Sequence, residues 1–172
     1  MMAEYVTASV LEGMAEGTVI SATQTRPNNT TAYTAGDVVG QDAAANIEFT
    51  NVMVAAGDRF VIFNASLRID VGAIPAGMSS FRLHLYNAAP TAITDNLAYN
   101  LIAADRAKYL GFITIPAPID AGDTLWAQVS DVNFVGKLAD ASTTLYAVLQ
   151  TVGAYTPTAL TVKTVTLNVA AV

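Results

Sequence analysis

The chain has 172 residues, 53% of them hydrophobic and 13% charged, with a formal net charge of -6 and no cysteine. This length predicts one domain with its own core. The absence of cysteine excludes a disulfide scaffold and thiolate chemistry. The acidic balance argues against a nucleic-acid partner, because phosphates require gathered Lys and Arg. We also expect no membrane span and no secretory signal, because long apolar runs are missing, so synthesis in a reducing cytoplasm is favoured.

The first 17 residues leave two interpretations open. Apolar residues there have a weak helical spacing that glycines interrupt, and an extended arm fits equally well: Tyr5, Val6, Val10, Leu11 and Met14, with Gly13 and Gly17. Terminal segments are often ordered only by a partner. We therefore predict an N-terminal arm, residues 1–17, and a single β domain, residues 18–172.

Period-two alternation of apolar and polar residues predicts strands along the rest of the chain. Residues 60–71 are the clearest case: one apolar face contains the odd-numbered residues from Val61 to Val71, and the other begins apolar at Phe60 and Ile62. Further strands are predicted over residues 18–25, 46–54, 80–87, 125–130, 143–152 and 161–169. Ala-Gly-Asp turns precede several of them, at Gly36, Gly57 and Gly122, where glycine permits positive φ.

These strands and turns predict an all-β fold, either an antiparallel β-sandwich or a jelly-roll-like barrel. Residues 95–108 depart from the pattern, because they are rich in alanine and have apolar residues at helical spacing. We predict one short helix there, inside a long loop, with Asp95 as its N-cap.

His84 is the single histidine, so a site with two histidine ligands is excluded. It could act as a lone general base beside Arg82 and Tyr86, but the alternation places it as a polar residue on the outer or interface face of a strand. A nucleophile elbow of the Gly-x-Ser-x-Gly type is missing from the sequence. Nucleophilic catalysis is therefore not expected.

The carboxylates are explained by turns. Asp37, Asp58 and Asp123 each follow a glycine, where an Asp side chain can bond nearby backbone N–H groups. Glycoside hydrolysis by a pair of acids, or a calcium site at Asp120 and Asp123, would need geometry that the spacing does not indicate. We predict no enzyme activity, no metal site and no cofactor.

The most polar stretch, residues 26–33, predicts an exposed loop whose residues could contact a neighbour: Arg26, Asn28, Asn29 and Tyr33. Trp126 is expected in the core or at a subunit contact. The low charge density predicts that part of the surface is covered in a homo-oligomer, since charges are depleted in buried interfaces.

Four stretches carry a resemblance: RPNNTTAYTAGDVVG (26–40), FRLHLYNAAP (81–90), DRAKYLG (105–111) and TTLYAVLQTVGAYTP (143–157). They resemble a family of small structural proteins encoded among the virion genes of tailed bacteriophages, over residues 19–169. The resemblance implies a virion component of the head-decoration or cement type, which binds the major capsid protein on the outer capsid surface as a homotrimer. This family has no active-site motif, so no functional residue is carried over.

Two other functions stay open at the level of sequence. A tail, neck or baseplate component would share the same composition. A carbohydrate-binding module would stack sugar rings on Trp126, Tyr86 or Tyr99. For the decoration function, the expected contacts come from the arm, through Tyr5, Val6, Val10 and Leu11, or from the loop at residues 26–33.

Overall fold

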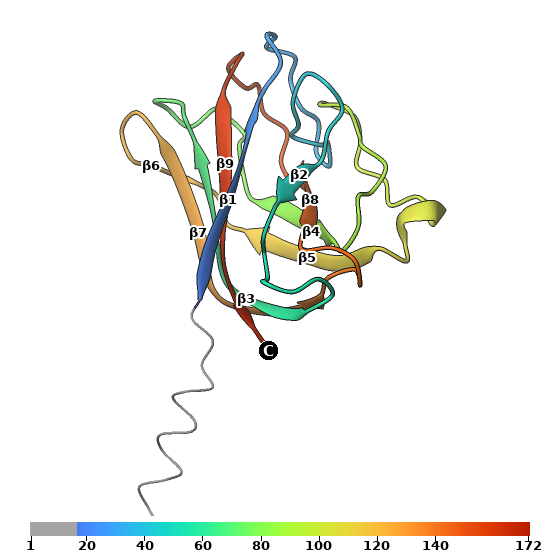
Figure 1. The fold of residues 1–172 in the computed structure, drawn as a ribbon. Helices are drawn as coiled ribbons and strands as arrows, with labels where there is room; N and C mark the ends of the chain where they lie inside the picture. The colour runs from blue at the N-terminus through green and yellow to red at the C-terminus, as the bar shows by residue number, and fades with distance from the viewer. Residues whose placement is uncertain (1–16) are drawn as a thin grey trace, which may run out of the picture.

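The computed structural model describes residues 17–172, which form two antiparallel sheets packed face to face (Figure 1). The five-stranded sheet has the order β1-β9-β3-β7-β6 and the four-stranded sheet the order β2-β8-β4-β5. The strands are β1 (Thr18–Thr25), β2 (Ile47–Phe49), β3 (Arg59–Ile69), β4 (Phe81–Tyr86), β5 (Tyr109–Ile115), β6 (Ile119–Asp120), β7 (Leu125–Lys137), β8 (Leu145–Thr151) and β9 (Val162–Ala171).

The connectivity is that of a jelly roll. Strands near one end of the chain pair with strands near the other: β1 with β9, β2 with β8, β3 with β7 and β4 with β5. These four pairs alternate between the two sheets, as when one long folded hairpin is rolled up. The predicted all-β antiparallel fold is confirmed, and the strand order selects the jelly roll from the two alternatives.

The core lies between the sheets, where apolar side chains of both inner faces meet. Leu67 and Leu125 from the five-stranded sheet, and Leu83 and Leu149 from the four-stranded sheet, belong to one buried cluster. The alternation that predicted β4 and β7 is confirmed, since Leu83 and Leu125 are fully buried while their neighbours Arg82 and Trp126 are exposed. Burial of this apolar surface is the main stabilising contribution to the fold.

The predicted face of residues 60–71 is wrong in its first half. A β-bulge lies between Ile62 and Asn64, where the register to both β7 and β9 shifts. The extra residue, Phe63, moves the inner face from even-numbered to odd-numbered positions. Phe60 and Ile62 are therefore buried, Phe63 is 37% exposed, and the predicted odd-numbered face is inward only from Ala65 onwards. Phe60 packs beside Gly136, where any Cβ would lie 2.5 Å from its ring.

The helix expected over residues 95–108 is reduced to a single 3₁₀ turn, Ala103–Asp105. The turn begins after Ile102, and no side chain caps it, so the predicted N-cap role of Asp95 is wrong. Asp95 instead accepts hydrogen bonds from groups 55 and 62 residues away. Long-range hydrogen bonding has overridden the local propensity.

The agreement between predicted and observed strand boundaries varies from strand to strand. β1 matches its predicted range, whereas the strand expected over residues 46–54 is the three-residue β2, followed by a loop. Strands β5 and β6 were not among the predicted elements. The turn glycines are confirmed, with positive φ at Gly36, Gly57 and Gly122. Within the described residues, no helix is long and apolar enough to cross a membrane.

Candidate interaction surface

The outer face of the four-stranded sheet is covered by loops through an aromatic layer. The His84 ring stacks on Tyr99 from the 87–108 loop, with 3.8 Å between ring centroids. Its Nδ1 lies 3.0 Å from the Tyr109 hydroxyl and its Nε2 lies 3.0 Å from Oε1 of Gln150. The hydroxyls of Tyr86 and Tyr99 are 2.6 Å apart. Both ring nitrogens of His84 thus have hydrogen-bond partners.

His84 points outward from its strand, as the alternation predicted, but it is only 5% exposed because the loop covers it. Burial lowers the pKa of His84 below its ordinary value of 6.5; the hydrogen bond to Gln150 opposes this shift and the Arg82 charge adds to it. The neutral ring is therefore favoured inside the layer. This arrangement attaches a loop to a sheet.

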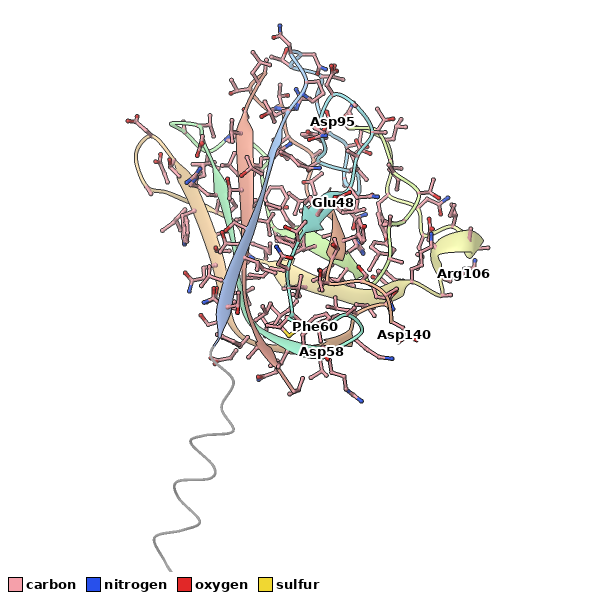
Figure 2. The ribbon with its side chains drawn as sticks, viewed as in Figure 1. Glu48, Asp58, Phe60, Asp95, Arg106 and Asp140 are labelled. Carbon is pink, nitrogen blue, oxygen red and sulfur yellow. The ribbon has the colours of Figure 1, made fainter. Side chains whose placement is uncertain are left out.

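A second polar cluster is buried where the loops meet β9. The Tyr33 hydroxyl donates to Oδ1 of Asp95 at 2.6 Å, and the Gly40 N–H donates to the same oxygen at 2.8 Å. Arg26 donates to the Tyr33 hydroxyl at 3.0 Å and lies 3.7 Å from Oδ2 of Asp95. Lys163 donates to the Gly40 carbonyl at 2.6 Å. The carboxylate of Asp95, which Figure 2 labels, therefore holds the 87–108 loop to residues 26–40.

Arg26 and Tyr33 are 2% and 1% exposed, so the expectation that they sit in an exposed loop is wrong. The Arg26 guanidinium also donates to the backbone carbonyls of Asn29 and Thr31, which folds the loop around its side chain. Because these donors and the ring are used inside the molecule, neither side chain reaches a neighbour in this fold. Asn28 and Asn29 are exposed, and their interface role stays a prediction.

The cluster has an excess of positive charge, which burial makes costly. Desolvation lowers the pKa of Lys163 from 10.5 to about 8, with Asp95 opposing this shift and Arg26 adding to it. Burial and the hydrogen bond to Asp95 raise the pKa of Tyr33. The adjoining cavity, lined in part by Arg26, Tyr33 and Lys163, has a volume of about 10 Å³. It accommodates nothing larger than a water molecule.

The carboxylates occupy structural positions at different ends of the molecule. Asp37 accepts hydrogen bonds from the Thr34 backbone and hydroxyl, and Asp120 accepts one from the Gly122 N–H. Figure 2 places Asp95 at one end of the sandwich and Asp58 and Asp140 at the other. In the part of the chain that the structure describes, no three His, Asp or Glu residues are grouped to hold a metal ion.

The aromatic residues that a sugar platform would require are kept apart. Tyr86 is 2% exposed beneath Tyr99, on the four-stranded sheet, while Trp126 is 38% exposed on β7 of the other sheet. Ile119 of β6 lies directly opposite Trp126. The three aromatic residues do not form a common stacking surface.

The outer face of the five-stranded sheet is open and poor in charge. We call it the hydroxyl face, and its middle rows consist of Val19, Ser21, Thr23 and Thr25 (β1), Val162, Thr164, Thr166, Asn168 and Ala170 (β9), Asn64, Ser66 and Arg68 (β3), and Trp126, Gln128 and Ser130 (β7). Arg68 is the one charged residue among them and pairs with Asp70 at 2.9 Å. A charge-poor sheet face of this kind suits contact with another protein.

Short side chains on this face bond one another across strands. The hydroxyls of Ser21 and Thr166 are 2.8 Å apart and those of Thr23 and Thr164 are 3.0 Å apart. Exposure varies along these rows: Val19 is 65% exposed, the β9 residues of the face are partly exposed, and Ser66 in β3 is 6% exposed. This face was not among the predicted contact surfaces. Its signal was the alternation of Thr and Ser with apolar residues over residues 18–25 and 161–169.

The other predicted interface residues, Tyr5, Val6, Val10 and Leu11, lie outside the described residues. Three of the four predicted loop residues fall on the 26–29 turn or its buried base, at one end of the sandwich. None of them belongs to the hydroxyl face. The structure therefore does not bring the predicted contact residues of the loop onto the open sheet surface.

No protein-family model matches this chain, and no curated protein matches it by sequence. Among solved structures, the chain is similar to a capsid protein of Ralstonia phage GP4, with 16% identity, coverage of 91% of this chain and 85% of that one, and a TM-score of 0.42. A bacterial lipoprotein from Bacteroides thetaiotaomicron has 9% identity, coverage of 92% and 82%, and a TM-score of 0.37. A protein of Mud crab tombus-like virus has 12% identity, coverage of 95% and 94%, and a TM-score of 0.28. Likenesses this weak establish neither a family nor a function.

Proposed function

We propose that this protein is a structural component of a tailed-bacteriophage virion, and that it decorates the outer surface of the capsid by binding the major capsid protein. The observation that carries the proposal is the hydroxyl face, a wide and open sheet surface with a single charge in its middle rows. The resemblance of residues 19–169 to small phage virion proteins supports the same function.

The mechanism is mechanical. A decoration protein that spans neighbouring capsomers adds protein–protein contact area to the shell. If it binds the assembled head and not the free subunits, mass action shifts the equilibrium toward the intact particle. The hydroxyl face suits this work because short hydroxyl side chains lose little conformational entropy when a partner covers them. The low overall charge fits a protein that acts as a homo-oligomer, with a trimer at local threefold positions as the proposed form.

The test is co-sedimentation of the purified protein with tailless heads that have been stripped of accessory proteins. We expect saturable binding at a fixed ratio to the major capsid subunit, and heads that resist disruption better. Absence of binding to competent heads would overturn the decoration role and direct the search to the tail or neck.

Matched variants locate the contact. Gln128→Lys and Asn168→Lys each place a charge on the hydroxyl face without disturbing the core, and we expect each to weaken binding by about tenfold, because burying an unpaired charge is costly. Asn100→Lys adds the same charge to an exposed loop beside the four-stranded sheet and should leave binding unchanged. Equal effects of the three variants would assign the contact to another surface.

A further inference from the structure

One row of side chains crosses the whole hydroxyl face and becomes apolar at the border of the sheet. Neighbouring positions on β1, β9, β3, β7 and β6 are occupied, in this order, by Thr23, Thr164, Arg68, Trp126 and Ile119. Residues directly opposite one another point to the same face, so these side chains lie side by side on the outer surface. Trp126 and Ile119, which we call the apolar pair, are 38% and 64% exposed.

Strand β6 holds Ile119 in place without adding to the core. Both residues of this strand are exposed. A tight turn joins β6 to β7, and in it the Ala121 N–H donates to the Thr124 carbonyl at 2.8 Å. The fold therefore orders an exposed isoleucine beside an exposed tryptophan. Adjacent exposed apolar side chains with polar residues around them are typical of a protein–protein contact.

Arg68, which lies between Thr164 and Trp126 in this row, is held from two sides. Its Nε lies 2.9 Å from Oδ1 of Asp70, and its Nη2 donates to Oγ1 of Thr164 at 3.4 Å. A side chain that is already ordered loses less conformational entropy when a partner covers it. Trp and Arg are among the residue types enriched in the few side chains that dominate binding energy at interfaces. The row thus has a preorganised anchor at its β6 end.

Three exposed carboxylates flank the apolar pair. Asp120 follows Ile119 directly, and Asp123 belongs to the turn between β6 and β7. Asp70 follows β3 and pairs with Arg68. We call these three aspartates the acidic rim. One arginine and three carboxylates leave an excess of two negative charges around an apolar centre, which favours a partner with basic side chains.

A second copy of this chain is poorly suited to cover this surface. The chain contains 8 Lys and Arg residues against 14 Asp and Glu residues. Of its basic residues, Arg26 and Lys163 are buried, and Arg68, Lys108 and Lys137 already pair with carboxylates. A second copy therefore has few basic side chains to offer the acidic rim, and its carboxylates would be repelled. The surface suits a different protein with a basic contact region.

We propose that the apolar pair and the acidic rim bind a segment of the major capsid protein in which an apolar side chain is flanked by Lys or Arg. The apolar side chain packs against Trp126 and Ile119, and the basic side chains face the acidic rim. The hydroxyl rows of β1 and β9 surround the contact on one side and exclude water from it. This inference rests on the proposed function and deepens it, because it assigns most of the binding energy to one border of the hydroxyl face.

Truncation of the tryptophan tests the anchor by co-sedimentation with the stripped, tailless heads. Trp126→Ala should weaken head binding at least about thirtyfold, the loss typical of a central interface residue. Val135→Ala is the matched control, because Val135 is an apolar residue on the outer side of the same strand and is 54% exposed. It should change binding less than about twofold. Ile119→Ala lies in a strand that adds nothing to the core, so it keeps the fold intact, and it should weaken binding about tenfold.

Neutralising the acidic rim tests the charge of the partner segment. Asp120→Asn with Asp123→Asn removes two charges but keeps the oxygen that accepts a hydrogen bond from the Gly122 N–H. Binding should weaken about tenfold at low salt, and its dependence on salt concentration should become shallower. Asp58→Asn with Asp140→Asn removes two charges from the opposite end of the sandwich and should have neither effect (Figures 1 and 2).

Failure of this inference is distinguishable from failure of the proposed function. If the unaltered chain and Trp126→Ala bind heads equally well, the anchor is overturned and the decoration function stands. An unchanged salt dependence in the Asp120→Asn, Asp123→Asn variant would overturn the basic partner segment. Self-association that Trp126→Ala abolishes, with head binding retained, would assign the apolar pair to a second copy instead. If the unaltered chain does not bind heads, both proposals fail.

Discussion

The two sheets of this jelly roll present opposite outer faces. The four-stranded sheet directs His84, Tyr86 and Gln150 outward, and loops cover them with Tyr99 and Tyr109. The five-stranded sheet directs Ser, Thr and Asn outward, and most of these side chains are exposed or half-buried, with Ser66 the buried one. Aromatic rings on a sheet face are stabilised when loops pack over them and exclude water. Short hydroxyl side chains on neighbouring strands can instead hydrogen-bond one another while exposed. In this protein the aromatic face is covered by its own loops, whereas the hydroxyl face is left available to a partner.

The two faces also differ in what their residues contribute, since one supports the stability of the fold and the other is available for binding. Asp95 and its partners hold the covering loops to β9, so changes there should lower stability. The hydroxyl face contributes few buried contacts, so changes there should be tolerated by the fold and affect binding instead. The predictions below test this division in order of expected size.

The largest effect is expected for Asp95→Ala. Removing the carboxylate leaves Arg26 and Lys163 buried without their counter-charge and the Tyr33 hydroxyl without its acceptor. Loss of one partner from a buried ionic cluster costs about 3–5 kcal/mol in the free energy of unfolding. Urea unfolding measures this cost. Asp95→Asn, which keeps an acceptor oxygen, should cost less, and equal costs would mean that the charge itself is unimportant.

Tyr99→Ala should come second, with a cost of about 2–3 kcal/mol, because it removes the ring stacked on His84 and the hydroxyl partner of Tyr86. Opening the layer to water should also raise the pKa of His84 toward 6.5, which NMR titration measures. Tyr99→Phe keeps the stack and is the control. An unchanged pKa of His84 in Tyr99→Ala would show that the ring does not exclude water from it.

The alternation of apolar and polar residues predicted most strands of the two sheets, but it did not predict how the strands pair. Alternation located β1, β4, β7 and β9, because half-buried strands have a period of two. Pairing between the ends of the chain has no local signature, so the jelly roll was one of two alternatives. The bulge at Phe63 is set by two neighbouring strands at once, and the sequence of β3 alone reads as continuous alternation.

The buried polar residues were also mispredicted because their partners are distant in the sequence. Arg26, Tyr33 and Asp95 looked like a polar loop and a helix cap, because each has those local preferences. Their actual partners lie far along the chain, and only the fold brings them together. The composition of the hydroxyl face, in contrast, follows from the Thr and Ser positions of β1 and β9 once the outward side of these strands is known.

Lys163 should make the free energy of unfolding depend on pH. Its folded-state pKa, about 8, is below the ordinary 10.5, so between these values the unfolded chain binds more protons and stability rises with pH. From pH 7 to pH 9.5 the gain should be about 1–2 kcal/mol. Lys163→Met should flatten the rise, as urea unfolding at the two pH values would show. Parallel slopes for both chains would contradict the shifted pKa of Lys163.

The smallest effect is expected on the hydroxyl face. Thr164→Val with Thr166→Val removes two hydroxyl pairs, with Thr23 and Ser21, but these atoms are accessible to water and valine is well suited to a strand. Each substitution should change the free energy of unfolding by less than about 0.5 kcal/mol. Thermal and urea unfolding of the double variant measure this. A cost comparable to that of Tyr99→Ala would mean that the open face supports the fold as much as the covered one does. A small cost, combined with weaker binding to phage heads, would mean that these threonines serve contact with a partner.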